Sequence, residues 1–276
     1  MTRFTRNYEL EISFDGDAQA VVIKPPLRIS FQADKSIRGQ LNKIRIQAYN
    51  MLESRRLRIV KDPEERKRIN INLRVGYKDA LETVYKGTVH QCSNERQGPD
   101  IITTIEGLDG GFDFLNSYTS RTVEGSERAV DACLSDMSNT ATGKITERPV
   151  LTRPKVLVGN SARLIEDMVG PDETWYIDDE QFYILKDNEV VSRFVPKISP
   201  ETGLISTPTR KMQEVTFSTL MNPSLKIGHR VDLESTTAPY LNGVYKIDTI
   251  SYQGDNFGDE WSQTCTGRLA AGVKVI

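Results

Sequence analysis

Residues 84–107 have the sequence VYKGTVHQCSNERQGPDIITTIEG, and residues 244–267 have the sequence VYKIDTISYQGDNFGDEWSQTCTG. The two stretches share six identical residues at a constant offset of 160, among them Val-Tyr-Lys at the start and glycine at the end. Average residue usage gives roughly one or two matches over such a window by chance. Acidic residues also correspond, as Glu95 does with Asp255. Each stretch has the pattern of a strand, a polar turn and a second strand, so two copies of one β-hairpin are predicted.

The chain before and around the first copy alternates apolar and polar residues with a period of two, which is typical of half-buried strands. Strands are expected at 8–14, 27–31, 43–49, 69–77, 83–92 and 101–108. Successive antiparallel strands with one hydrated face predict a barrel or a sandwich. A short helix is expected at 51–58, and the highly charged run 62–68 is expected to be a solvated loop.

The pattern changes to helical spacing after about residue 115. The residues Val130, Cys133, Leu134 and Met137 share one face of a predicted helix, with Ser126 as its expected N-cap. A second helix is expected to begin at Asn160 or Ser161 and to end before Gly170-Pro171. Two short strands at 173–177 and 181–185 follow. This block therefore has the pattern of a small α+β module.

These patterns predict an α+β protein that is mainly β, with three domains. The first is an antiparallel β-barrel or sandwich at 1–118, and the second is the small α+β domain with its linkers at 119–212. The third is a shorter β domain at 213–276, with room for a strand borrowed from 140–158. A length of 276 residues suggests about two domains and allows three small ones.

Composition excludes several classes of protein. The 36 Lys+Arg residues nearly balance the 38 Asp+Glu residues, so no overall basic character indicates nucleic-acid binding. No apolar run approaches the ~20 residues that span a bilayer, and the first residues lack the apolar core of a secretory signal. A soluble product made in the cytosol is expected. Three widely spaced cysteines and two histidines argue against a disulfide framework and a His-based zinc site.

Three polar clusters were weighed as sites of catalysis or ion binding. The adjacent acids Asp178, Asp179 and Glu180 fit a hairpin tip better than a general acid and base. The glycine-rich run 106–113 lacks the pattern of a phosphate loop or a calcium loop, and is expected to be a strand end followed by a flexible turn. The acidic and amide residues Asp255, Asn256, Asp259 and Glu260 also fit a hairpin tip better than a cation site.

Two further groups are interpreted as structural. His90 and Cys92 share a strand face, but a Cys-His nucleophile would need a third orienting group and a lowered thiol pKa. The aromatic residues Trp175, Tyr176, Phe182 and Tyr183 are expected to form the core of the small module. We therefore expect no enzyme activity, and no catalytic, cofactor-binding or metal-binding residues.

Several segments, in order along most of the chain, resemble the central baseplate hub proteins of contractile-tailed phages. The segment 43–52 is similar to their strand-then-YNL segment, and 72–77 with 84–89 is similar to their GY hairpin. The segment 223–231 with 241–245 is similar to the pattern of their last barrel, and 175–185 to the hairpin of their inserted small domain. The sequence departs from the family pattern at 51–68 and 186–210, where contacts cannot be carried over.

The resemblance implies two tail-tube-type barrels that flank an inserted domain, in a structural homotrimer of the virion's tail baseplate. It implies contacts with the hexameric tail tube protein and the trimeric central spike protein, and with tape measure and baseplate wedge proteins as further candidates. DNA is implied only as the genome in transit. Three chains with two similar β units each would place six similar edges around one axis. The polar residues Glu9, Glu11, Arg28, Lys43 and Arg45 suit a surface beside a hydrated channel.

Two alternatives stay open at this point. A carbohydrate-binding or cell-wall-degrading tail module would need an exposed aromatic platform, for which Trp175 is the candidate, or a separated carboxylate pair. An oligonucleotide-binding β-barrel would need basic residues between aromatic ones.

Overall fold

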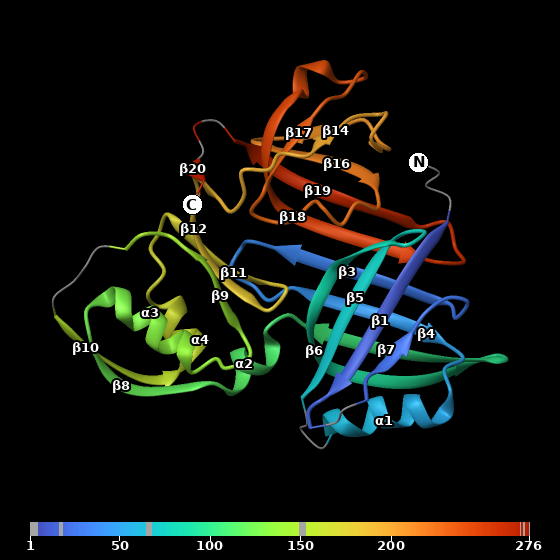
Figure 1. Ribbon diagram of the computed structural model, residues 1–276. Coiled ribbons are helices and arrows are strands. Elements are labelled where there is room, and N and C mark those ends of the chain that lie inside the picture. Colours follow the sequence, from blue (N-terminus) through green and yellow to red (C-terminus); the bar gives the residue numbers. More distant parts are fainter. Residues whose placement is uncertain are drawn as a thin grey trace.

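The computed structural model describes residues 5–16, 19–64, 68–148, 153–270, 272 and 274–275, without the side chains of 61–64 and 126–127. The molecule is mainly β, with large antiparallel sheets and short helices, so the fold class predicted from the sequence is confirmed (Figure 1). None of the helices in these ranges has the length and apolar character needed to cross a membrane.

The N-terminal part forms what we call the first β unit. It contains β1 (Arg6–Phe14), β2 (Val21–Ile23), β3 (Ile29–Ser36), β4 (Lys43–Tyr49), β5 (Ile69–Tyr77), β6 (Ala80–Gln97) and β7 (Asp100–Leu108). Burial alternates along these strands as the period of two predicts, and Tyr8, Leu10 and Ile12 of β1 are fully buried. The helix α1 (Glu53–Glu64) follows β4 and precedes β5 along the chain.

Two expectations for this unit need correction. The predicted helix at 51–58 extends to Glu64, so 62–64 are helical and not a loop, while 65–67 lie outside the described residues. The polar tip at 93–100 is also shorter than expected, because β6 continues to Gln97 and pairs there with Asp100. A high density of charge in the sequence does not exclude a helix, because a surface helix carries charged and polar residues on much of its circumference.

The C-terminal part forms the second β unit. It contains β14 (Lys197–Ile198), β15 (Thr209–Lys211), β16 (Glu214–Leu220), β17 (Arg230–Leu233), β18 (Gly243–Asp255) and β19 (Trp261–Leu269), with the short helix η1 (Pro239–Leu241) before β18. The expectation that 140–158 lends it a strand is wrong. Within the described residues of that stretch, β9 (Ala141–Ile145) pairs with β12 (Gln181–Lys186) and β10 (Pro154–Asn160) pairs with β8 (Tyr118–Glu124). The added strand is β15.

One sheet runs through both β units. Its order is β15-β16-β19-β18-β3-β4-β7-β6-β5-β1-β2, with β17 paired to β18 and β14 paired to β17. The units join where β18 pairs antiparallel with β3, from Thr249 opposite Ser36 to Asp255 opposite Ser30. We call this junction the seam; β3 and β18 lie side by side in the centre of Figure 1. Across it the two hydrophobic cores form one cluster.

The two units repeat a topology of five strands. In the first, β4 lies between β3 and β7, β6 is on the other side of β7, and β5 pairs with the N-terminal half of β6. In the second, β16 lies between β15 and β19, β18 is on the other side of β19, and β17 pairs with the N-terminal part of β18. The five strands follow the same order along the chain in both. The predicted repeat of one hairpin is therefore part of a longer repeat.

The register shows which residues of the two copies are equivalent. Gly107 faces Val89 and Gly267 faces Ile247, and a β-bulge follows on the partner strand in both hairpins. The distance along the chain from partner to glycine is two residues longer in the second copy. The two Val-Tyr-Lys triplets are consequently displaced from each other by two positions, whereas the glycines are equivalent.

The middle module lies beside the two units (Figure 1). It contains α2 (Gly111–Asn116), β8 (Tyr118–Glu124), α3 (Ser126–Ser135), β9, β10, α4 (Ser161–Glu166), β11 (Glu173–Asp178), β12 (Gln181–Lys186) and β13 (Glu189–Val190), the last paired with β20 (Lys274–Val275). The predicted apolar helix face is buried in the module's own core. The N-cap of α3 is Gly125, so Ser126 is already helical, and Asn160 caps α4 as expected.

Candidate functional site

The tip of the β11–β12 hairpin, residues Asp178, Asp179 and Glu180, is inserted between the module and the two β units. We call it the anchor. Asp179 and Glu180 have positive φ angles of 53° and 62°, which a tight two-residue hairpin turn requires. The predicted hairpin tip is present, but it is not at the solvent surface, since Asp178 is only 7% exposed and Glu180 only 9%.

Two lysines, one from each β unit, neutralise the first two acids of the anchor. Lys35 Nζ on β3 lies 2.5 Å from Asp178 Oδ1 and 2.9 Å from Asp179 Oδ1. Lys226, in the loop before β17, pairs with the other oxygen of Asp179. The Lys35 side chain is 2% exposed, so its charge depends on these carboxylates. The anchor thus connects the module to both units at once.

The other groups of the anchor bind the first β unit. Glu180 lies 3.0 Å from Arg68 Nη2 and 2.8 Å from Lys86 Nζ. Asp109, which follows β7, accepts hydrogen bonds from the backbone N–H of Asp179 at 2.7 Å and of Glu180 at 2.8 Å. Asp109 is fully buried, so the expected flexible turn in 106–113 is wrong at this residue. The carboxylate satisfies two backbone donors that would otherwise be buried without partners.

The electrostatics of the anchor follow from burial and from these pairs. Burial raises the pKa of Asp109 well above its usual range. Burial acts to raise the pKa of Asp179 too, but Lys35 and Lys226 outweigh it and lower that pKa. Burial acts to lower the pKa of Lys35, yet Asp178 and Asp179 together raise it well above its usual value. Carboxylate oxygens of Asp109, Asp178 and Asp179 lie close enough to share a cation, and the Lys35 ammonium is the cation that lies against two of them.

The tip of the β18–β19 hairpin fixes the seam at its other end. Asp255 accepts a hydrogen bond from Arg28 Nη2 at 2.8 Å and from the N–H groups of Phe257 and Gly258 at 2.9 Å each. Asn256 accepts from the N–H of Ile29 at 2.8 Å and donates to the carbonyl of Leu27 at 3.0 Å. These residues bind the start of β3, which agrees with the preference for a hairpin tip over a cation site.

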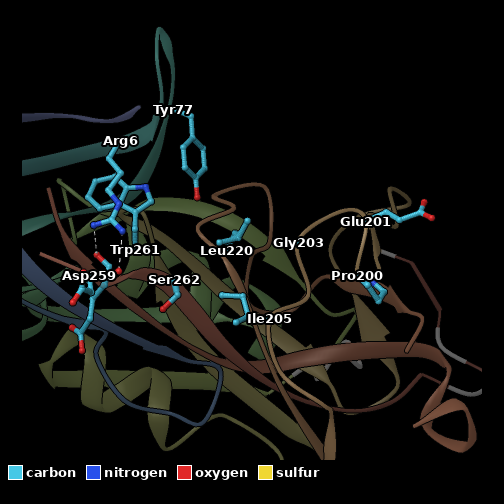
Figure 2. Close-up of a pocket in the computed structure, with 11 residues that line it drawn as sticks. Arg6, Tyr77, Pro200, Glu201, Gly203, Ile205, Leu220, Asp259, Trp261 and Ser262 are labelled. Atoms are coloured by element: carbon cyan, nitrogen blue, oxygen red, sulfur yellow. Dashed lines mark hydrogen bonds between the residues drawn. The ribbon is translucent and has the colours of Figure 1, made fainter. Parts of the chain in front are cut away.

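A groove with a volume of about 780 Å³ lies between the first and the second β unit. Figure 2 shows Arg6 and Tyr77 of the first unit on one side and Ile205 and Leu220 of the second on the other. The Arg6 guanidinium donates to backbone carbonyls of the β18–β19 tip, including Asp259 at 2.8 Å and Asp255 at 2.9 Å. Arg6 therefore links β1 to the second unit.

His90 and Cys92 do not form a reactive pair. His90 is the residue left without a partner at the β6 bulge, and it is exposed. Burial raises the pKa of the Cys92 thiol to about 12, which opposes formation of a nucleophilic thiolate. The expectation that the two residues share a strand face is wrong, because the bulge at His90 reverses the alternation. His90 lies beside the polar residues Arg45 and Glu106, whereas Cys92 packs against the buried core.

The aromatic residues form two separate stacks. Trp175 is 6% exposed and lies between Phe114 and Phe182, with ring centroids 5.6 Å and 5.7 Å away. Tyr176 and Tyr183 stack at 4.8 Å. The prediction of an aromatic module core is confirmed for Trp175 and Phe182. It is wrong for Tyr176 and Tyr183, which pack into the core of the two β units. Trp175 is not available as a platform for a sugar ring.

Eight strands of the sheet, from β15 through the seam to β6, share one polar face. Hydroxyl and amide side chains dominate it. Its members include Ser30, Gln32 and Asp34 of β3, Lys43, Arg45 and Gln47 of β4, Thr249, Ser251 and Gln253 of β18, Ser262, Thr264 and Thr266 of β19, and Thr216 and Ser218 of β16. Hydroxyl pairs cross it, with Ser218 Oγ 3.0 Å from Thr264 Oγ1 and Thr216 Oγ1 3.1 Å from Thr266 Oγ1. Glu9 and Glu11 lie instead on β1, beyond this part of the sheet.

No sequence pattern indicates which residues are the partners of the anchor. The alternation of β3 places Lys35 on the buried face, but lysine is rarely buried, so the pattern alone does not predict its burial. Asp109 stood in a glycine-rich run that predicted flexibility. Only the fold, which brings residues more than 140 positions apart into contact, identifies them.

Comparisons with known proteins agree with this architecture. A family model described as "Baseplate hub gp41" matches residues 9–267. Among solved structures, the 43 kDa tail protein of prophage MuSo2 from Shewanella oneidensis has a TM-score of 0.64 at 8% identity, covering 97% of this chain and 99% of that chain. A tail protein from Neisseria meningitidis MC58 has a TM-score of 0.63 at 8% identity, with 95% and 96% covered.

A third similar structure is the E. coli c3393 protein, a component of the type VI secretion system with structural similarity to the T4 tail proteins gp27 and gp5. Its TM-score is 0.62 at 9% identity, covering 95% of this chain and 78% of that chain. No curated protein matches the sequence. Identities this low show a shared fold, and the match to the family model shows the family.

Proposed function

This chain belongs to the baseplate hub gp41 family, structural proteins of the phage virion tail, and from that premise we propose that it is the trimeric hub that adapts a hexameric tail tube to a trimeric spike. The single observation that supports the proposal is the five-strand repeat joined in the plane of one sheet. One chain then presents two nearly equivalent β units side by side.

A ring of three chains would contain six such units. The six β units would match the six subunits of the tail tube on one side of the ring. Each chain has only one middle module, so the modules would give the rest of the ring threefold symmetry. Closing the ring would also pair the strand edges that an isolated chain leaves open. We retain the three-domain division as a proposal, with β14 and β15 added to the second β unit.

The polar face of the eight strands is proposed to line the tail channel. Its side chains are mainly neutral hydroxyls and amides, and its charges are mixed in sign, as in the pair of Arg45 with Glu106 at 3.7 Å. Proteins bind DNA chiefly through contacts between basic side chains and the DNA phosphates. A face of this composition would therefore stay hydrated and let DNA pass without retaining it.

The decisive experiment is the oligomeric state of the purified chain, measured by mass photometry and by electron microscopy. We expect a ring of three chains with pseudo-sixfold symmetry. A stable monomer that also fails to trimerise when mixed with tail tube and spike subunits would overturn the hub proposal.

The two other candidate functions gain no specific support. Trp175, the candidate for glycan stacking, is buried between two phenylalanines. The polar face presents hydroxyls where an oligonucleotide-binding barrel presents basic and aromatic side chains. The absence of enzyme activity belongs to the proposal and follows from the structural role of the family.

A further inference from the structure

Two edges of the eight-stranded part of the sheet have no partner strand within the described residues. One is β15, whose three residues are all exposed. The other is the C-terminal half of β6, where β5 no longer pairs and residues 93–97 are all exposed. An open strand edge is a template for pairing with another chain.

The repeat makes these two edges equivalent to the two strands of the seam. In the shared topology β15 takes the place of β3, and β6 takes the place of β18. The strands β3 and β18 pair with each other inside the chain. Their equivalents, β15 and β6, lie at the two outer ends of the eight strands, where the same edges stay unpaired. In one chain they lie at opposite ends of eight strands and cannot meet.

The seam also supplies the register. The two glycines are equivalent, so the residues that face them, Ile44 and Val215, are equivalent too. The next strand out pairs Ala33 with Ile44 in the first unit and Arg210 with Val215 in the second. Arg210 is therefore equivalent to Ala33. On the other side of the glycines, Asn94 follows Val89 by the same number of residues as Tyr252 follows Ile247. Asn94 is therefore equivalent to Tyr252. Ala33 faces Tyr252 in the seam, which places Arg210 opposite Asn94.

We propose that β15 of one copy pairs antiparallel with residues 93–95 of β6 in a second copy, with Ser93 opposite Lys211 and Glu95 opposite Thr209. The proposal rests on the proposed trimer and names the strand pair and register that would close it. Three such junctions alternate with three seams around the ring.

The side chains at this junction are compatible with the register. Ser93 faces Thr104 and Thr209 faces Thr216, so both lie on the polar face and the hydroxyl surface continues across the junction. Glu95 comes diagonally next to Lys211, a favourable charge pair across strands. On the other face the same register places Met212, 88% exposed in the single chain, opposite the half-buried Cys92.

The test is a disulfide placed at the predicted pair. The variant Ser93→Cys with Lys211→Cys is oxidised as the assembled trimer and run on a non-reducing gel. An intrachain bond is excluded because a disulfide needs Cα atoms within about 7 Å. We expect the band to shift from monomer to a covalently closed trimer, while each single variant stays monomeric. The matched control, Ser93→Cys with Thr209→Cys, is displaced by two residues and should lose most of the cross-linking.

Opposite residues in an antiparallel pair alternate between a wider and a narrower spacing, and only one of the two suits a disulfide. A second measurement therefore uses the native chain, without introduced cysteines. A zero-length carbodiimide should join Glu95 to Lys211 between chains, as detected by mass spectrometry. A trimer in which neither cross-link forms would overturn this register and leave the hub proposal standing. Absence of any trimer before cross-linking would instead overturn the hub proposal itself.

Discussion

Gly107 and Gly267 occupy the same position in two different hairpins, each opposite the residue that precedes a β-bulge. A Cβ at Gly267 would overlap the carbonyl oxygen of Lys246. A Cβ at Gly107 would lie 2.8 Å from Ile71 Cδ1, 3.0 Å from Ile44 Cγ2 and 3.1 Å from the carbonyl oxygen of Thr88. Neither position has space for a Cβ, and in both the carbonyl of the residue before the glycine's partner is among the nearest atoms. The repeat thus preserves glycine at a crowded position beside the bulge.

Replacing Gly267 by alanine should destabilise the protein by about 1–3 kcal/mol, because the rigid backbone of β18 must move. Chemical denaturation of the variant and the wild type measures the difference. The matched control is Gly170→Ala, where a Cβ would meet only the Glu173 side chain at 3.5 Å. Equal stability of the two variants would show that the bulge does not need the glycine.

Replacing Lys35 by methionine should destabilise the protein by about 3–5 kcal/mol, because Asp178 and Asp179 would be left buried with one lysine fewer. Denaturant midpoints measure this loss. The matched control, Lys86→Met, removes a lysine whose side chain is 47% exposed and should cost at most about 1 kcal/mol. Similar losses in both variants would contradict the importance of the buried pair.

The Asp255→Asn variant should show the contribution of the β18–β19 tip through its pH dependence. Burial acts to raise the pKa of Asp255, but Arg28 and two backbone N–H groups outweigh it and lower that pKa. A carboxyl with a lowered pKa in the folded state stabilises above the unfolded pKa of about 3.9 and loses this effect as the pH falls through the folded value.

At neutral pH the wild type should therefore be more stable than Asp255→Asn by about 1 kcal/mol. The difference should shrink as the pH falls below about 4. Thermal unfolding of both proteins from pH 7 to pH 2.5 provides the measurement. A difference that stays constant over this range would indicate that the charge of Asp255 has no role.

A lysine on the polar face should slow the passage of DNA if this face lines the channel. The change Thr264→Lys adds one positive charge per chain, and the phosphate attraction it creates weakens with salt. We expect slower genome delivery from virions that carry the variant, with partial recovery at higher ionic strength. Thr264→Gln is the neutral control, and equal slowing by both variants would contradict the electrostatic cause.

The sequence predicted the elements of the two β units well, because one face of each strand is buried and the alternation is clear. Strands β1, β4, β5 and the hairpin β6–β7 appear where Leu10, Ile46 and Leu73 alternate with polar residues. It missed β2, β14 and β15, which are only two or three residues long. The partner of β14 is the distant β17, whereas β15 pairs with β16, the next strand along the chain. Such short strands exist only because a neighbouring strand provides the hydrogen bonds.

The anchor was predicted as a hairpin tip and its burial was not foreseen. Acidic residues at a turn normally indicate solvent exposure. Burial of Asp178 depends on Lys35 and burial of Glu180 depends on Arg68, and each pair joins residues from different units. Charge pairs formed by the tertiary fold leave no periodic pattern, so sequence alone could not reveal this centre.

The seam has a consequence for the kinetics of assembly. Three of the six joints of the proposed ring form within single chains as they fold, and their formation does not depend on concentration. Only two bimolecular encounters then complete the ring, whereas six separate units would need five. Each encounter avoided spares a loss of translational and rotational freedom estimated at several kcal/mol. The proposed ring would therefore assemble at a lower protein concentration than a ring of six separate units.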